Sequence, residues 1–142
     1  MTTVKQLLDT KGHDICAIHP EATVLDALKA FVNNNVGSLM VMEDDKLVGL
    51  VTERMYARNV FLKGKHSPTT LVRDIMETEV VYADPENTVP ECMAIMTDKK
   101  IRHLPVMENG KVLGLISIGD LVQSTISDQK FTIEQLEHYI RG

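Results

Sequence analysis

The sequence contains an internal repeat, and this repeat constrains the possible folds more than any other feature. Residues 20–24 (PEATV) and 85–89 (PENTV) lie 65 positions apart, and at the same offset residues 41–43 (VME) align with 106–108 (VME). The register continues without a gap from about residue 15 to residue 57 of the first copy. We therefore interpret the 142 residues as two copies of a unit of about 60 residues, followed by a tail.

Each copy is predicted to form the same order of strands and helices. In the first copy, the apolar run 15–18 ends at a His-Pro pair, which predicts a short strand, and Thr23 is a candidate N-cap for a helix. Residues 38–42 and 46–51 then predict two strands joined by a tight turn, and Thr52 opens a second helix. The corresponding second-copy elements are a strand at 80–83, a helix after Thr88, strands at 103–107 and 111–116, and a helix after Ser117.

The β-α-β-β-α order has a consequence for the architecture. A unit of about 60 residues buries little apolar surface by itself, so two units packed sheet to sheet would share one core. We expect an α+β fold in which two repeats, at residues 4–64 and 69–127, pack about a pseudo-twofold axis. This arrangement predicts a cleft at the seam between the repeats.

Residues 128–142 are predicted to form a helical tail after the second repeat. Thr132 is a plausible N-cap, and Ile133, Leu136 and Ile140 share one face of the helix that would follow. This apolar face either packs on its own module or contacts a second copy of the chain or another partner, and the sequence leaves these possibilities open.

Composition and charge exclude several classes of function. The net charge is −5 and aromatic residues make up only 4% of the chain, so neither a basic face nor a stacking surface for nucleic acid is expected. No apolar run is long enough to cross a membrane, and the N-terminus lacks the pattern of a secretory signal. We therefore expect a cytoplasmic protein with no membrane or nucleic-acid partner.

Two sequence segments make the likeness to a known family specific. Residues 101–106 (IRHLPV) and 114–120 (GLISIGD) resemble the CBS-domain pair, or Bateman module, and the resemblance extends over about residues 4–127. Residues 52–58 (TERMYAR) and the tail are similar to those of stand-alone bacterial CBS-domain proteins.

The resemblance implies a regulatory function. CBS-domain pairs bind adenosine-containing ligands in the cleft, so it implies AMP, ADP, ATP or NAD(H) as a regulatory ligand and no catalytic cofactor. It also implies a homodimer and an effector protein, of unknown identity, that responds to the ligand. The alternative is a dimerisation or scaffold module with a vestigial, empty cleft.

The second helix of the second copy begins with the strongest candidate residues. Ser117 and Asp120 have the spacing of a capping box, in which both side chains satisfy free backbone N–H groups. The same groups can bind a ligand, since a helix N-terminus favours phosphate and a carboxylate accepts the hydroxyls of a ribose. Gly119 has no side chain and would allow a ligand to approach the backbone closely. In the first copy Thr52 is present, but Met55 replaces the aspartate, so we expect the Asp120 half-site to bind adenosine better.

Basic residues are the second group of candidates. Arg102 and His103 can neutralise phosphate, or they are solvent-exposed charges at the start of a strand. Gly37 and Ser38 occupy their places in the first copy and would leave room for a base or sugar. The resemblance favours contact with the cleft for Arg102 and His103. The other candidate nucleotide-binding residues are Arg54, Arg58, Lys11, Asp14, Ile15, Cys16, Val36, Val80, Val81 and Ile116.

An enzymatic function finds little support in the sequence. Cys16 lies near His13 and His19, but no carboxylate or oxyanion pattern accompanies this possible thiol nucleophile. No metal-ligand spacing, phosphate loop or dinucleotide fingerprint is present. We therefore expect neither catalysis nor a bound metal.

Overall fold

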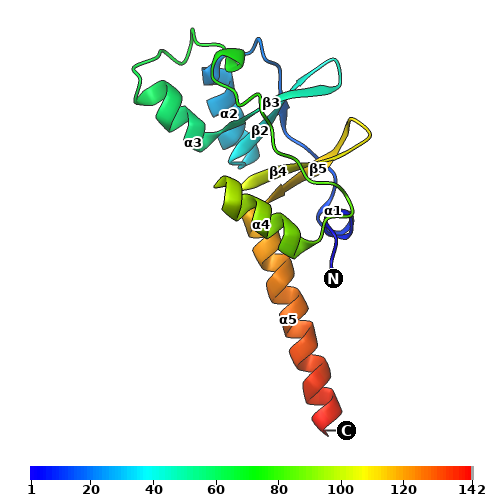
Figure 1. The fold of residues 1–142 in the computed structure, drawn as a ribbon. Coiled ribbons are helices and arrows are strands. Elements are labelled where there is room, and N and C mark those ends of the chain that lie inside the picture. The colour runs from blue at the N-terminus through cyan, green and yellow to red at the C-terminus, as the bar shows by residue number, and fades with distance from the viewer. Residues whose placement is uncertain (142) are drawn as a thin grey trace. The chain divides into compact units, whose positions relative to one another are not determined.

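The computed structural model describes residues 1–141, which form two compact units (Figure 1). The first-repeat unit comprises Asp14–Val81 together with Asn109–Val112. The second-repeat unit comprises Met1–His13, Tyr82–Glu108 and the chain from Leu113 onward. The N-terminal segment thus belongs to the same unit as the second repeat.

The first-repeat unit is built on a three-stranded sheet with the order β1-β2-β3. Strand β1 runs parallel to β2, and β2 pairs antiparallel with β3. The predicted strand at 15–18 is shorter in the structure, because only its last two residues form β1. The elements in chain order are β1 (Ala17–Ile18), α2 (Val24–Asn34), β2 (Ser38–Glu43), β3 (Lys46–Thr52), α3 (Glu53–Tyr56), the π-helical turn η1 (Ala57–Phe61) and the 3₁₀ turn η2 (Val72–Asp74).

Helix α2 shows how local sequence signals and burial act together in this unit. Thr23 and Asp26 form a complete capping box, which confirms the predicted N-cap. The helix ends at Asn35, whose φ of 51° lies in the left-handed region. Val24 and Phe31 are buried on the inner face and belong to one core cluster with residues of β2 and β3. The predicted amphipathic helix is therefore confirmed.

The second-repeat unit repeats most of this plan with one reduction. Strands β4 and β5 pair as predicted, but the strand expected at 80–83 is absent from the described structure. In its place a single parallel bridge joins Ala83 to Val106 of β4. The predicted pairing of this first strand with the next strand is therefore reduced to one isolated bridge. The elements are α1 (Val4–Lys11), α4 (Val89–Lys99), β4 (His103–Glu108), β5 (Lys111–Ser117) and α5 (Ile118–Arg141).

The segments that lead into the two repeats are exchanged between the units. In the second-repeat unit, the Val4 N–H donates to the Asn87 carbonyl, and the Val89 N–H donates to the Thr2 carbonyl, both at 2.9 Å. In the first-repeat unit, residues 70–72 make the equivalent pair of bonds with residues 22–24, both at 2.8 Å. Helix α1 therefore packs with the second repeat, although it precedes the first. The repeat boundaries derived from the sequence remain a prediction.

Two glycines, 65 positions apart, allow this packing. A Cβ atom on Gly114 would lie 2.8 Å from Leu8 Cδ2 of α1, and one on Gly49 would lie 2.6 Å from Met76 Sδ. Both distances are shorter than van der Waals contact. Leu8 and Met76 therefore occupy the space that any side chain at Gly114 or Gly49 would need. The repeated glycine is thus explained by close approach of Leu8 and Met76.

The C-terminal segment corrects one expectation. The tail does not begin a helix of its own, because α5 runs without interruption from Ile118 to Arg141. The Thr132 hydroxyl donates to the Asp128 carbonyl one turn earlier instead of capping an N-terminus, so the predicted N-cap is wrong. Within the described residues no helix is both long and apolar enough to cross a membrane.

Candidate functional site

The site in the second-repeat unit is built where β5 passes into α5. The Ser117 N–H donates to Asp120 Oδ2 at 2.8 Å, and the Asp120 N–H donates to Ser117 Oγ at 3.2 Å. The capping box predicted from the sequence is therefore present. No protein group in the described part of the chain donates a hydrogen bond to the other carboxylate oxygen, Oδ1. The cap thus leaves one acceptor of Asp120 free for a ligand.

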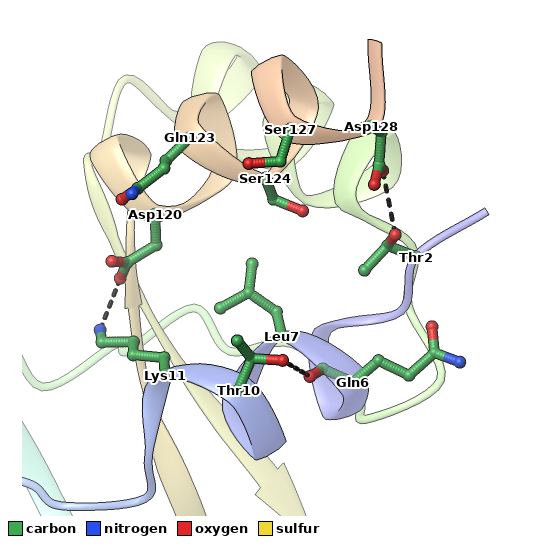
Figure 2. A pocket seen from close by; sticks show the side chains of 10 residues that line it. All are labelled: Thr2, Gln6, Leu7, Thr10, Lys11, Asp120, Gln123, Ser124, Ser127 and Asp128. Carbon is green, nitrogen blue, oxygen red and sulfur yellow. Dashed lines mark hydrogen bonds and ion pairs between the residues drawn. The ribbon is translucent and has the colours of Figure 1, made fainter. Parts of the chain in front are cut away.

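Lys11, from the last turn of α1, completes the surroundings of Asp120 (Figure 2). Its Nζ donates to Asp120 Oδ2 at 2.5 Å and to the Leu115 carbonyl at 2.7 Å. The sequence made Lys11 a weaker candidate, as a residue just upstream of the first strand, and did not connect it with Asp120, which lies 109 positions away. Only the exchange of α1 into the second-repeat unit brings the two residues together.

Electrostatics keep Asp120 ionised. Partial burial by itself would raise the pKa of the Asp120 carboxyl, but the hydrogen bond from Lys11 and those from Ser117 outweigh it. The net effect lowers the pKa below its ordinary value. Asp120 is therefore a charged acceptor at neutral pH, which is the form that binds hydroxyl groups most strongly.

His103 and Arg102 place further polar groups at this site. His103 lies at the start of β4 and is partly buried, and burial lowers the pKa of its imidazole. The positive charge of Lys11 lowers it further, Asp120 opposes this effect, and Arg102 adds a smaller lowering. His103 is therefore neutral at pH 7 and offers one donor and one acceptor. Arg102 is exposed, and its carbonyl accepts from the Ile118 N–H at 2.9 Å.

The burial of His103 predicts a pH-dependent stability. Because its pKa is lowered on folding, the unfolded chain binds more protons than the folded chain below pH 6.5, so acidification removes stability in this range. We expect the loss of melting temperature between pH 7 and pH 5.5 to be smaller in His103→Gln than in the unmodified chain. Differential scanning fluorimetry at both pH values measures this difference. Equal losses in the two proteins would show that His103 contributes nothing to the pH profile.

A groove of about 450 Å³ adjoins this cluster, between α1 and the first turns of α5 (Figure 2). Lys11 and Asp120 lie at one end of it, and Leu7 contributes an apolar side chain to a lining that is otherwise polar or charged among the described residues. Most of the lining residues were not predicted from the sequence. The polar residues recur three and four positions apart along α5, and this periodicity is the signal that would have identified them. The missed residues are Thr2, Gln6, Leu7, Thr10, Gln123, Ser124, Ser127 and Asp128.

The corresponding part of the first-repeat unit is chemically different. The Thr52 hydroxyl accepts from the Met55 N–H at 3.1 Å, but Met55 has no carboxylate to return the bond. Val36 and Gly37 line a pocket of about 390 Å³ with Phe31, Val32, Asn35 and Glu53. Arg54 and Arg58 do not line this pocket, and both side chains are exposed. The position equivalent to Asp120 therefore holds Met55, which cannot provide an ionised acceptor.

The remaining candidate residues differ in accessibility. Ser38 and Ile116 are buried, with exposed fractions of 2% and 0%, whereas Asp14 and Gly119 are exposed. The others are partly buried: Ile15, Cys16, Val80 and Val81. The side chain of Ile116 is thus part of the core.

The histidines near Cys16 in the sequence are engaged with other groups. His13 Nδ1 lies 2.8 Å from the Leu113 carbonyl and its Nε2 lies 3.1 Å from Asp9. The His19 ring accepts from the Glu21 N–H. The other thiol, Cys92, is buried, and this burial raises its pKa to about 11. Across residues 1–141 no group of His, Cys, Asp and Glu side chains is arranged to hold a metal ion.

Comparison with known proteins identifies both repeats. A family model described as "CBS domain" matches residues 4–60 and again residues 72–126. The mitochondrial CBS domain-containing protein CBSX3 of Arabidopsis thaliana is 35% identical to this chain, and the match covers 99% of this chain and 73% of the relative.

Solved structures agree in fold. The CBS domain structure NE2398 is 47% identical with a TM-score of 0.84, and the match covers 88% of this chain and 98% of the other. A putative signal-transduction protein with CBS domains from Burkholderia ambifaria MC40-6 is 45% identical with a TM-score of 0.86, and the match covers 90% of this chain and 96% of the other. The CBS domain pair of MJ0100, solved with 5′-methylthioadenosine and S-adenosyl-L-methionine, shares the fold at 22% identity and a TM-score of 0.79, covering 90% and 98%.

Proposed function

Because the chain belongs to the CBS-domain family, as a small protein with a pair of CBS repeats, we propose that it is a regulatory module for an adenosine-containing ligand. The ligand is an adenine nucleotide (AMP, ADP or ATP) or NAD(H), and it acts as a signal, not as a catalytic cofactor. Binding favours one conformational state over another through its differential affinity for the two, and an effector protein responds to that state.

One observation carries this proposal: Asp120 is an ionised carboxylate with a free oxygen at a helix N-terminus. Its Oδ1 accepts from no described group, while Oδ2 is held by Ser117 and Lys11. A ribose diol matches such an acceptor, because a charged carboxylate forms strong hydrogen bonds with hydroxyl groups. The ribose of the ligand therefore binds Asp120 in this proposal.

The phosphate end of the ligand meets positive charge in the same unit. The positive charges of Lys11 and Arg102 both act on the His103 imidazole, and Lys11 is also paired with Asp120. A phosphate near His103 would raise the pKa of its imidazole and convert it into a second donor. This cluster favours a charged nucleotide over a neutral nucleoside, although the whole chain has a net charge of −5.

The first-repeat unit binds the ligand more weakly in this proposal. Met55 cannot accept a ribose hydroxyl, and its flexible thioether is suited to packing on an apolar ring. Val36, Gly37 and Thr52 then contact the base or sugar beside it. The other candidate residues named from the sequence belong to the same proposal, as do the absence of catalysis, a homodimeric state and a cytoplasmic location.

The ligand class can be tested by thermal stability. A ligand at about 100 times its dissociation constant stabilises the folded state by about 2.7 kcal/mol, which corresponds to several degrees of melting temperature for a chain of this size. We expect AMP, ADP, ATP or NADH to raise the melting temperature, in proportion to the logarithm of concentration. S-adenosylmethionine, the ligand type in the MJ0100 structure, is included as a comparison.

The same assay distinguishes the alternative function. A scaffold module with a vestigial site would show no shift with any of these compounds at millimolar concentration. Mass spectrometry of small molecules released from gently purified protein provides a second, unbiased readout. Recovery of no adenosine compound, together with the absence of any shift, would contradict the proposed function.

A further inference from the structure

Exposed apolar residues on α5 recur with the spacing of a coiled-coil seam. Ile126, Ile133 and Ile140 are seven residues apart, and Val122 and Leu136 fall at the intermediate d positions. Their exposed fractions range from 41% for Val122 to 81% for Ile140. At about 100° per residue these five side chains lie within about 80° of one another, which makes one narrow stripe along the helix.

The stripe has no partner within its own unit. The other sides of α5 are in use: Leu121 is fully buried, Thr125 contacts Met93 of α4, and Ser124 and Ser127 face the groove beside α1. From residue 126 to residue 141 every side chain is exposed, and Figure 1 shows this half of α5 extending beyond α4. The Thr2 hydroxyl donates to Asp128 Oδ2 at 3.0 Å, but beyond this residue about 13 residues of helix, roughly 20 Å long, form no hydrogen bond or ion pair with another element of the described chain.

The charges on this half of the helix argue against a membrane as the occupant. Between residues 126 and 141 the acidic residues Asp128, Glu134 and Glu137 outnumber the basic residues Lys130 and Arg141. Helices that lie on membranes have a basic polar face that attracts anionic lipids. A mildly acidic helix with a narrow apolar stripe instead matches another helix of the same kind.

We propose that the C-terminal part of this stripe, formed by Ile133, Leu136 and Ile140, is the docking surface for α5 of a second copy of the chain, in an antiparallel two-stranded coiled coil. The register that places Ile133 against the partner's Leu136 also places Gln129 against the partner's Ile140. This register uses only residues 129–140, which lie wholly beyond Asp128, the last residue of α5 that hydrogen-bonds to another element of the described chain. The two folded bodies would then lie at opposite ends of the paired segment.

Charge complementarity selects the antiparallel orientation. Lys130 and Glu137 both occupy heptad position e, seven residues apart. In an antiparallel pair, position e of one helix faces position e of the other, so Lys130 faces the partner's Glu137, and the twofold symmetry repeats the pair. In a parallel pair, position e faces position g, which holds Thr125 and Thr132, and no ion pair forms. Only the antiparallel arrangement therefore uses both charges.

The seam is tested by the oligomeric state of the full chain. Sedimentation equilibrium is expected to show a dimer, and Ile133→Glu with Leu136→Glu should raise its dissociation constant at least about thirtyfold, because two charges enter each apolar layer. Phe131→Glu with His138→Glu is the matched control. It adds the same charges at position f, on exposed side chains outside the seam, and should change the constant less than about threefold. All four positions are exposed, so folding is retained, which circular dichroism verifies.

The orientation is tested by exchanging charges. Lys130→Glu and Glu137→Lys should each weaken the dimer about tenfold, since each replaces two attractive pairs with two repulsive ones. The double variant should recover to within about threefold of the unmodified chain. A monomer at about 100 µM, a dimer unaffected by the seam variant, or a double variant as weak as the single ones would each overturn the proposal. None of these measurements requires nucleotide, so they are independent of the proposed ligand.

Discussion

Asp120→Ala is expected to weaken adenine-nucleotide binding about a hundredfold. Asp120 provides the ionised acceptor for the ribose hydroxyls, and hydrogen bonds to a charged group contribute about 1.5–3 kcal/mol each. The loss of two such bonds, partly offset by solvent, corresponds to about two orders of magnitude in the dissociation constant. Isothermal titration calorimetry with the nucleotide that gives the largest thermal shift measures the change directly.

Two variants separate this effect from damage to the fold. Asp120→Asn keeps an acceptor for the Ser117 N–H but removes the charge, so the cap is retained while binding still weakens. Met55→Ala is the matched substitution in the first-repeat unit and should leave affinity within about threefold, whereas Met55→Asp should strengthen the weaker half-site. If Asp120→Ala bound nucleotide with unchanged affinity and stoichiometry, the Asp120 half-site would not be the binding site.

Leu8→Ala is expected to destabilise the protein by about 3 kcal/mol. Leu8 is fully buried, although it belongs to a short helix near the N-terminus, and its methyl groups fill the space over Gly114. Truncating a buried leucine removes its transfer free energy and leaves a cavity, which together cost about 2–5 kcal/mol. The change in the free energy of unfolding is measured by urea denaturation followed by circular dichroism.

The control for Leu8 lies on the same helix. Lys5→Ala changes an exposed residue of α1 and should alter stability by less than about 0.5 kcal/mol. A comparably small effect of Leu8→Ala would mean that α1 is not docked on the second repeat as described. Recovery of stability in Leu8→Ala with Gly114→Ala, where the added methyl group occupies part of the cavity, would strengthen the assignment of this contact.

Most of the fold was predictable because its signals are local. The capping residues Thr23 and Thr88, the two-residue turn at Asn109 and Gly110, and the helical spacing after each N-cap act over a few residues. The capping box of Ser117 and Asp120 was predictable for the same reason. The repeat then extended each assignment from one copy to the other. The family resemblance was equally local, since two short segments carried it.

The errors of prediction concern features that depend on distant parts of the chain. Thr132 has the local signature of an N-cap, but α5 is already helical when it reaches this residue, so its hydroxyl bonds back into the helix. The strand expected at 80–83 has suitable residues, yet only Ala83 finds a partner in β4. The contact of Lys11 with Asp120 depends on the exchange of α1, which no local pattern encodes. Tertiary partners decided all three outcomes.

The exchange of lead-in segments also sets an order for folding during synthesis. The helices and strands of the first-repeat unit all lie within Asp14–Val81, so their partners are present once about the first half of the chain has left the ribosome. Helix α1 is made before any of them, but its partners, such as the Asn87 carbonyl and Gly114, emerge only later. Helix α1 is therefore translated before the elements of the first-repeat unit but docks after them, and the buried face of Leu8 stays exposed to solvent until the second repeat is complete.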